Sequence, residues 1–251
     1  GGTIDRFYEA DPDGINTDGR LDLRSEEGYV GYNGKWVQVY LGRFDNHWST
    51  HDRQGGLLTD NPRSFDQVQF QLGNETLSFK SILGVLDNLS PDSTFTGEDF
   101  GSGVTRRYAF FHRLDWSPLP TLKLSLMEGE IYHSPTAGLS LRNLNPLHVL
   151  LTESRNKPRL NDRNIMVGGA IWYQLGPVTI YGQSMLADIL VSDREPRKRS
   201  GEFYPAIYTI NGSVTWAGVT DRLDLGAELD VISANSYRTD NRADEWSYLQ
   251  R

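Results

Sequence analysis

Apolar and polar residues alternate with a period of two along several stretches of this chain. From Leu223 to Val231 the sequence LDLGAELDV places leucine, alanine and valine on one face and acidic residues or glycine on the other. The same alternation runs from Gln67 to Leu72, where three apolar side chains oppose three glutamines. A period of two is that of a β-strand, and a helix would place these charges within its apolar stripe. The pattern therefore predicts strands with one apolar and one polar face.

Short turn signals alternate with long loops along the chain. The turn signals are Asn33-Gly34, Gly73-Asn74, Ser117 to Pro120, Gly176-Pro177 and Ala217 to Thr220. The expected loops run approximately over 46–65, 87–104, 134–163, 192–202 and 238–243. Because each tight turn joins two long strands, all tight turns should meet at one end of the sheet, which is typical of an outer-membrane β-barrel. Strands of a soluble β-sandwich, the main alternative, are usually about half as long.

These patterns predict an all-β fold, an antiparallel transmembrane β-barrel with about 11 or 12 visible strands, in a single domain over residues 1–251. Barrel strands keep charges on a polar inner face, which accounts for charged residues inside the hairpin between Tyr108 and Ser134. On its first strand we expect Arg107, Arg113 and Asp115 to face inward. The opposite face, expected to meet lipid, carries Tyr108, Phe110, Leu114 and Trp116, with His112 as an exception.

The second strand of this hairpin fits the barrel pattern less well. Leu122, Leu124 and Leu126 share a face with Glu128 and Glu130, and carboxylates do not belong on a lipid-facing surface. We expect either a β-bulge near Gly129 that reverses the two faces or a strand that leaves the membrane at this point.

Composition narrows the classes of partner and chemistry. The 251 residues carry a formal net charge of −8, which argues against nucleic acid as the main partner. The chain has no cysteine, so disulfides and thiolate chemistry are excluded. It also has no apolar run of the roughly 20 residues that a membrane-spanning helix needs, whereas a barrel strand needs only about 9 to 11.

Five segments resemble the Wzi-like capsule-assembly family of outer-membrane barrels. They are YLGRFDNHW (Tyr40 to Trp48), GGLLTDNPRSFDQVQF (Gly55 to Phe70), RRYAFFHRLDWSP (Arg106 to Pro118), LRNLNPLHVL (Leu141 to Leu150) and IYGQSMLADI (Ile180 to Ile189). The resemblance implies a bacterial outer-membrane protein that binds, displays or helps export surface polysaccharide without catalysis. It also implies contact with outer-membrane lipid and lipopolysaccharide, and with other envelope proteins.

The family also has more strands than this sequence shows. An outer-membrane barrel normally ends in a strand with a terminal aromatic residue, whereas this chain stops at WSYLQR. We therefore expect both ends to be truncated and the 251 residues to be an incomplete copy of a larger barrel of roughly 16 to 18 strands.

Two loops supply most of the candidate polysaccharide-binding residues. The first loop, residues 43–66, combines the flat aromatic ring of Trp48 with polar groups that suit a sugar. The same mixture also suits an internal plug held by ion pairs. The loop between Asp193 and Glu202 concentrates basic residues that suit acidic sugars or phosphate, although such runs are usually only solvated. The full candidate set is Arg43, Asp45, His47, Trp48, Asp60, Asn61, Arg113, Asn145, Arg194, Arg197, Lys198 and Arg199.

Enzymatic and metal sites are weaker interpretations. Ser49 lies near histidines and aspartates, but without the glycines of a nucleophile elbow. Glu128 and Glu130 share a face about 7 Å apart, a separation within the inverting-glycosidase range but common among acidic pairs. The stretch from Asp11 to Asp22 has Ile15 where a calcium loop needs an oxygen ligand. We expect a protein that is not an enzyme and has no cofactor or metal.

The second hypothesis is a diffusion porin for small anions or oligosaccharides. A porin predicts an open interior with opposed charge ladders, whereas a polysaccharide-binding protein predicts a plugged interior. The two hypotheses differ in whether the residues of 46–65 and 134–163 fold into the barrel.

Overall fold

The computed structural model describes residues 28–44, 46, 48, 57, 65–89, 105–134, 150, 163–187, 207–220 and 222–232. Its ten strands form one sheet in which every neighbouring pair is antiparallel and adjacent along the chain. The strands are β1 (Gly28–Asn33), β2 (Val37–Phe44), β3 (Phe65–Gly73), β4 (Leu77–Leu89), β5 (Thr105–Leu119), β6 (Leu122–Ser134), β7 (Arg163–Leu175), β8 (Val178–Ala187), β9 (Ile207–Thr220) and β10 (Leu223–Ile232). The all-β, antiparallel prediction is confirmed.

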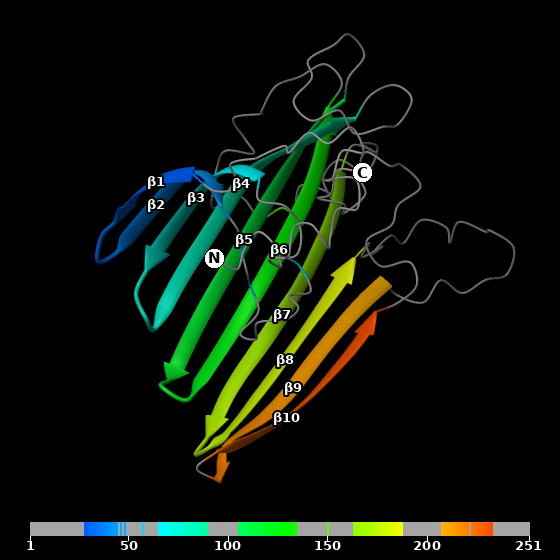
Figure 1. The fold of residues 1–251 in the computed structure, drawn as a ribbon. Coiled ribbons are helices and arrows are strands. Elements are labelled where there is room, and N and C mark those ends of the chain that lie inside the picture. Colours follow the sequence, from blue (N-terminus) through cyan, green and yellow to red (C-terminus); the bar gives the residue numbers. More distant parts are fainter. Residues whose placement is uncertain are drawn as a thin grey trace, which may run out of the picture.

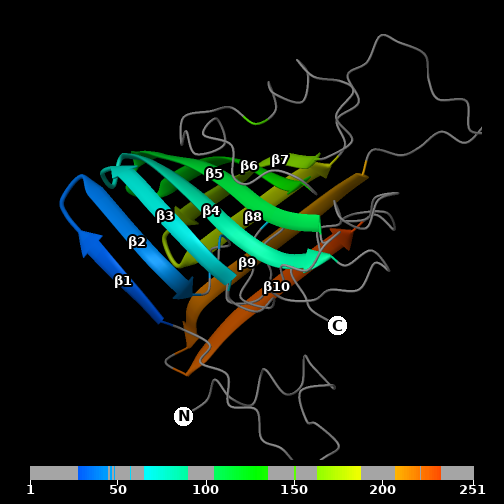
Figure 2. The ribbon, with the colours of Figure 1, turned by 90° about the horizontal axis from the view of Figure 1, so that it is seen from above.

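The sheet is curled but not closed. Figure 1 shows the strands side by side in chain order, and Figure 2 shows the sheet bending round from β1 to β10. Among the described strands, β1 and β10 each pair on one side only. The described residues thus form ten strands in a sheet that is not closed, and further strands of the expected 11 or 12 would lie outside these residues.

All tight turns lie at one end of the sheet, as predicted (Figure 1). The turn between β3 and β4 shows the local cause. The Asn74 side-chain Oδ1 accepts hydrogen bonds from the backbone N–H groups of Thr76 and Leu77, each at 2.9 Å. Gly73 precedes it with φ of 120°, and a Cβ there would strike the backbone oxygen of Leu77. Glycine is therefore required where this strand ends.

One predicted turn is misplaced. The residues Ala217 to Thr220 belong to β9, and the chain reverses after Thr220 instead. The glycine that suggested a turn, Gly218, has φ of 67° and lies where the β9–β10 register shifts. Its N–H donates to Asp224 Oδ1 at 2.6 Å. The signal therefore marks an irregularity in the strand pair, which also favours glycine.

The two faces of the sheet differ in polarity. The outer face is defined by large, exposed apolar side chains on successive strands, namely Leu41, Val68, Val85, Leu114, Leu126, Ile171, Ile180, Ile210 and Leu229. The inner face is defined by the residues that alternate with them, among them Gln67, Gln69, Arg113, Gln183 and Asn211. This arrangement confirms the predicted alternation and places Arg107, Arg113 and Asp115 together on the inner face.

A hydrophobic core covers part of the inner face. Trp48 and Leu57 lie outside the strands and pack against buried residues of β4 to β8, which are Ile82, Leu86, Ala109, Phe111, Met127, Ile131, Met166 and Met185. Phe65 adds to this core and lies directly over Gly84, whose missing side chain leaves room for the ring.

Candidate functional site

The loop end of the β5–β6 hairpin corrects the expectation for its outer face. Tyr108 and Phe110 were expected to meet lipid, but both are buried in a second core against Leu150. The β5–β6 register runs without a shift from Arg106↔Ser134 to Trp116↔Leu124, so the expected bulge near Gly129 is absent from this hairpin. Glu128 and Glu130 therefore remain on the outer face.

These carboxylates are accommodated because residues of the chain cover them. The His112 Nδ1 lies 2.9 Å from Glu128 Oε1, and the backbone N–H of Leu150 donates to the same oxygen at 3.1 Å. Glu130 is only 1% exposed. Burial of a carboxylate is tolerable when hydrogen bonds replace water, as they do at Glu128. The outer face thus changes from exposed and apolar near the turns to covered and partly polar near the loop end.

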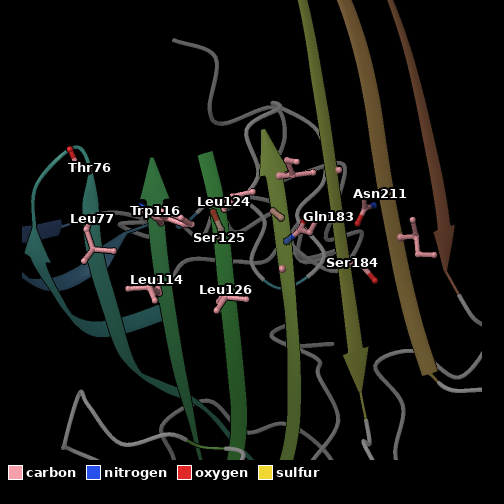
Figure 3. A pocket seen from close by; sticks show the side chains of 15 residues that line it. Thr76, Leu77, Leu114, Trp116, Leu124, Ser125, Leu126, Gln183, Ser184 and Asn211 are labelled. Atoms are coloured by element: carbon pink, nitrogen blue, oxygen red, sulfur yellow. The ribbon is translucent and has the colours of Figure 1, made fainter. Parts of the chain in front are cut away.

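An open hollow of about 1030 Å³ lies on the exposed, apolar part of the outer face. Figure 3 shows that Leu77, Leu114, Trp116 and Leu126 contribute to it from neighbouring strands. Its lining includes Gly169 and Gly182, which are half-buried and carry no side chain. The surface offers apolar contact and few polar groups, which is what hydrocarbon requires of a protein surface.

The inner face carries the polar candidate site, centred on Arg113 of β5. Its Nε donates to Asp115 Oδ1 at 2.8 Å, its Nη2 to Ser125 Oγ at 3.3 Å, and its Nη1 to the backbone oxygen of Trp48 at 2.9 Å. The guanidinium also lies 5.9 Å from the centre of the Trp48 ring. These contacts fix Trp48, which is 2% exposed, on the polar face of the sheet.

A second anchor holds the chain just after β2 on the same face. The Asn46 side-chain N–H donates to Gln67 Oε1 at 2.5 Å, and the Gln67 amide donates in turn to the backbone oxygen of Phe44. Both side chains are buried. Asn46 and Trp48 are therefore attached to the inner face at two neighbouring points.

A row of polar side chains continues this face across β8 and β9. Thr209, Asn211 and Ser213 are buried at alternate positions of β9, and their side-chain oxygens find no hydrogen-bond partner in the part of the chain that the structure describes. Asn211 Nδ2 donates to Asp230 on β10, and Tyr181 Oη to Gln183 Oε1 at 3.0 Å on β8. Unpaired polar atoms about 7 Å apart along a strand are suited to the hydroxyl groups of a saccharide or to water.

Of the predicted binding residues, the structure brings Trp48 and Arg113 together and separates Arg43 from them. Arg43 lies on the outer face and binds Asp66 through both Nε and Nη2, at 3.3 and 2.9 Å. Nine others lie outside the described residues: Asp45, His47, Asp60, Asn61, Asn145, Arg194, Arg197, Lys198 and Arg199. Asp11 to Asp22 and Ser49, which entered the metal and enzyme interpretations, also lie outside them.

Sequence reasoning missed Lys80, Lys123 and the polar row of β9. Lys80 pairs with Arg113 in the β4–β5 register, and Lys123 lies two residues from Ser125 on β6. Alignment outward from the tight turn of β5–β6 places Lys123 near Asp115, but the pairing of Lys80 with Arg113 joins two hairpins, and no local sequence signal gives it.

Comparisons of the chain with protein-family models, with curated proteins and with solved structures find no match. Within the described residues, no helix is long and apolar enough to cross a membrane. The same residues contain no group of three or more histidine or acidic side chains that could hold a metal ion. Any statement about function therefore rests on the two faces of the sheet.

Proposed function

We propose that this chain forms part of an outer-membrane β-barrel that binds surface polysaccharide and helps to display or export it, without catalysis. Support for the membrane comes from the outer face, where large apolar side chains are exposed on successive strands near the turns. Leu126 is 66% exposed and Trp116 50%. A water-soluble sheet would hide such a surface, whereas lipid accepts it.

The observation that carries the binding role is the position of Trp48 on the inner face. A diffusion pore needs an open interior, but here an indole ring and the core around it occupy the polar side of the sheet. The neighbouring polar row of β9 has unpaired oxygens that suit sugar hydroxyls. An occupied interior with hydrogen-bonding groups favours a binding protein over an open channel.

One observation favours the second candidate, a porin for small anions or oligosaccharides. On the inner face of β4 to β6, the basic residues Lys80, Arg113 and Lys123 outnumber the acidic Asp115, whereas β10 carries Asp224, Glu228 and Asp230. Opposed charges of this kind are what the porin hypothesis requires, and they remain compatible with a plugged binding protein.

Conductance and retention together separate the two functions. The protein, purified in detergent, is placed in planar bilayers and, separately, passed over a column of immobilised acidic capsular polysaccharide. The proposal expects no steady large channels but retention on the column. Large channels without retention would favour the porin, and neither channels nor retention would contradict both functions.

A further inference from the structure

Three cations gather around one carboxylate on the inner face of β4, β5 and β6. Lys80 lies beside Arg113 in the strand register, and the charges acting on it are those of Arg113, Asp115 and Lys123. Three positive groups against one negative group leave an excess of two positive charges. Like charges this close repel one another most where water is scarce, so such a cluster normally has a counter-ion.

The single carboxylate is already engaged. Asp115 accepts hydrogen bonds from Arg113 Nε at 2.8 Å and from Ser125 Oγ at 2.5 Å. Arg113 directs its remaining bonds to Ser125 and to the Trp48 backbone. Lys80 and Lys123, both only partly exposed, have no hydrogen bond or ion pair in the part of the chain that the structure describes.

The indole N–H of Trp48, beside Arg113, is a second and independent hydrogen-bond donor without an acceptor among the described residues. The Trp48 ring lies against the Arg113 guanidinium, and its Nε1 is buried without a partner among the described residues. Ammonium and indole N–H groups only donate hydrogen bonds. Lys80, Lys123 and the Trp48 Nε1 group therefore each require an acceptor, and an anion would supply both acceptors and charge.

We propose that Lys80 and Lys123, positioned around the Arg113–Asp115 pair and Trp48, form a binding site for an anionic group: a carboxylate, phosphate or sulfate. Arg113 and Asp115 act as positioning residues, because they are bonded to each other and hold Ser125 and Trp48 in place. The inference goes beyond the proposed function and holds for a plugged binding protein and for an anion-selective pore alike. The anion could be a free ion or a charged substituent of a saccharide.

Titration calorimetry on the full chain in detergent tests this site with three probes: inorganic phosphate, an oligogalacturonate, and a neutral glucose oligomer of the same length. We expect phosphate or the oligogalacturonate to bind and the neutral oligomer to bind far more weakly. Added salt should weaken the binding. Binding of phosphate alone identifies a free-anion site, binding of the oligogalacturonate alone identifies a saccharide-borne anion, and either result supports the proposal.

The variants Lys80→Gln and Lys123→Gln should each weaken anion binding about tenfold, since each removes a charge-assisted hydrogen bond. Lys35→Gln is the matched control, because Lys35 lies against Trp36 in the β1–β2 turn and loses the same charge. Without anion, Lys80→Gln should melt at the same temperature as the unaltered protein or at a higher one, which would show that its fold is intact. The proposal would be overturned if the neutral oligomer bound as tightly as the oligogalacturonate, or if neither anion bound. It would also be overturned if both lysine variants bound the anion as tightly as the unaltered protein, or if Lys35→Gln lost as much affinity as they did.

Discussion

The chain covers the loop end of the β5–β6 hairpin on both faces, but by different means. On the inner face, Trp48 packs into an apolar core and is fixed by Arg113. On the outer face, Leu150 packs against Tyr108 and Phe110 and is fixed by Glu128. Near the turns, by contrast, the outer face of the same hairpin has no cover among the described residues, and Leu126 is exposed.

Under the proposed membrane placement, this difference predicts which part of the outer face would contact lipid. A strand face that must meet hydrocarbon cannot present a carboxylate without paying a large desolvation penalty. The chain covers its outer face where it carries His112, Glu128 and Glu130, and leaves it bare where it carries leucine and tryptophan. If the chain inserts into the outer membrane as proposed, only the turn end of this hairpin would lie in the hydrocarbon, and its loop end would stand beyond it.

The largest expected effect comes from removing the inner cover. Trp48→Ala should lower the free energy of unfolding by about 3 to 5 kcal/mol, because it empties a buried aromatic site. It should also raise the conductance of the protein in planar bilayers, since the ring occupies the inner face. Denaturant unfolding and bilayer recording measure the two effects. Trp36→Ala, at an exposed tryptophan of the β1–β2 turn, is the control and should leave the conductance unchanged.

Removing Leu150, which covers the outer face, should lower the free energy of unfolding by less than removing Trp48 does, and it should leave the conductance unchanged. Leu150→Ala is expected to lower the free energy of unfolding by about 2 to 4 kcal/mol, the range for a buried leucine. Leu126→Ala removes the same atoms from an exposed site on the same face and should cost much less. If Leu150→Ala raised conductance as much as Trp48→Ala, the distinction between the two covers would be wrong.

A charge placed on the bare part of the outer face sharpens the contrast between lipid and water. Leu126→Arg should destabilise the protein folded into lipid vesicles by about 2 to 3 kcal/mol, because it puts a guanidinium into hydrocarbon. Thr215→Arg, on the inner face of β9, is the control and should have a small effect. Equal stabilities of Leu126→Arg and the unaltered protein would show that this surface faces water.

The smallest effect is expected at the ion pair between Arg43 and Asp66. Both side chains are substantially exposed, at 40% and 48%, so solvent screens their attraction. Arg43→Ala should therefore change the free energy of unfolding by less than about 1 kcal/mol and leave polysaccharide retention unaffected. A marked loss of retention would return Arg43 to the set of binding residues.

The sequence was sufficient for features that depend on neighbouring residues. Alternation from Leu223 to Val231 predicted the two faces of β10, and Asn74 with its preceding glycine predicted a tight turn. It was insufficient where distant segments meet. The spacing of Glu128 and Glu130 shows a conflict with lipid, but it does not show that Glu128 contacts His112 on the neighbouring strand and Leu150, which is 22 residues further along the chain.

The candidate site was predictable in part for the same reason. Trp48 and Arg113 were both identifiable by residue type, but their contact joins positions 65 residues apart. Lys80 and Lys123 resemble ordinary solvated lysines in the sequence. Their shared environment arises only when the registers of two adjacent strand pairs are combined.

The most direct test of the central claim is a single-cysteine scan along β6 from Leu122 to Glu130, since the chain contains no cysteine of its own. Each variant is spin-labelled in lipid vesicles, and its collisions with oxygen and with a water-soluble nickel complex are compared. Labels at Leu122, Leu124 and Leu126 should collide more often with oxygen than with the nickel complex. Labels at Glu128 and Glu130 should collide less often with oxygen than those three. Nickel access at Leu126, or equal oxygen access at all even positions up to Glu130, would contradict the account.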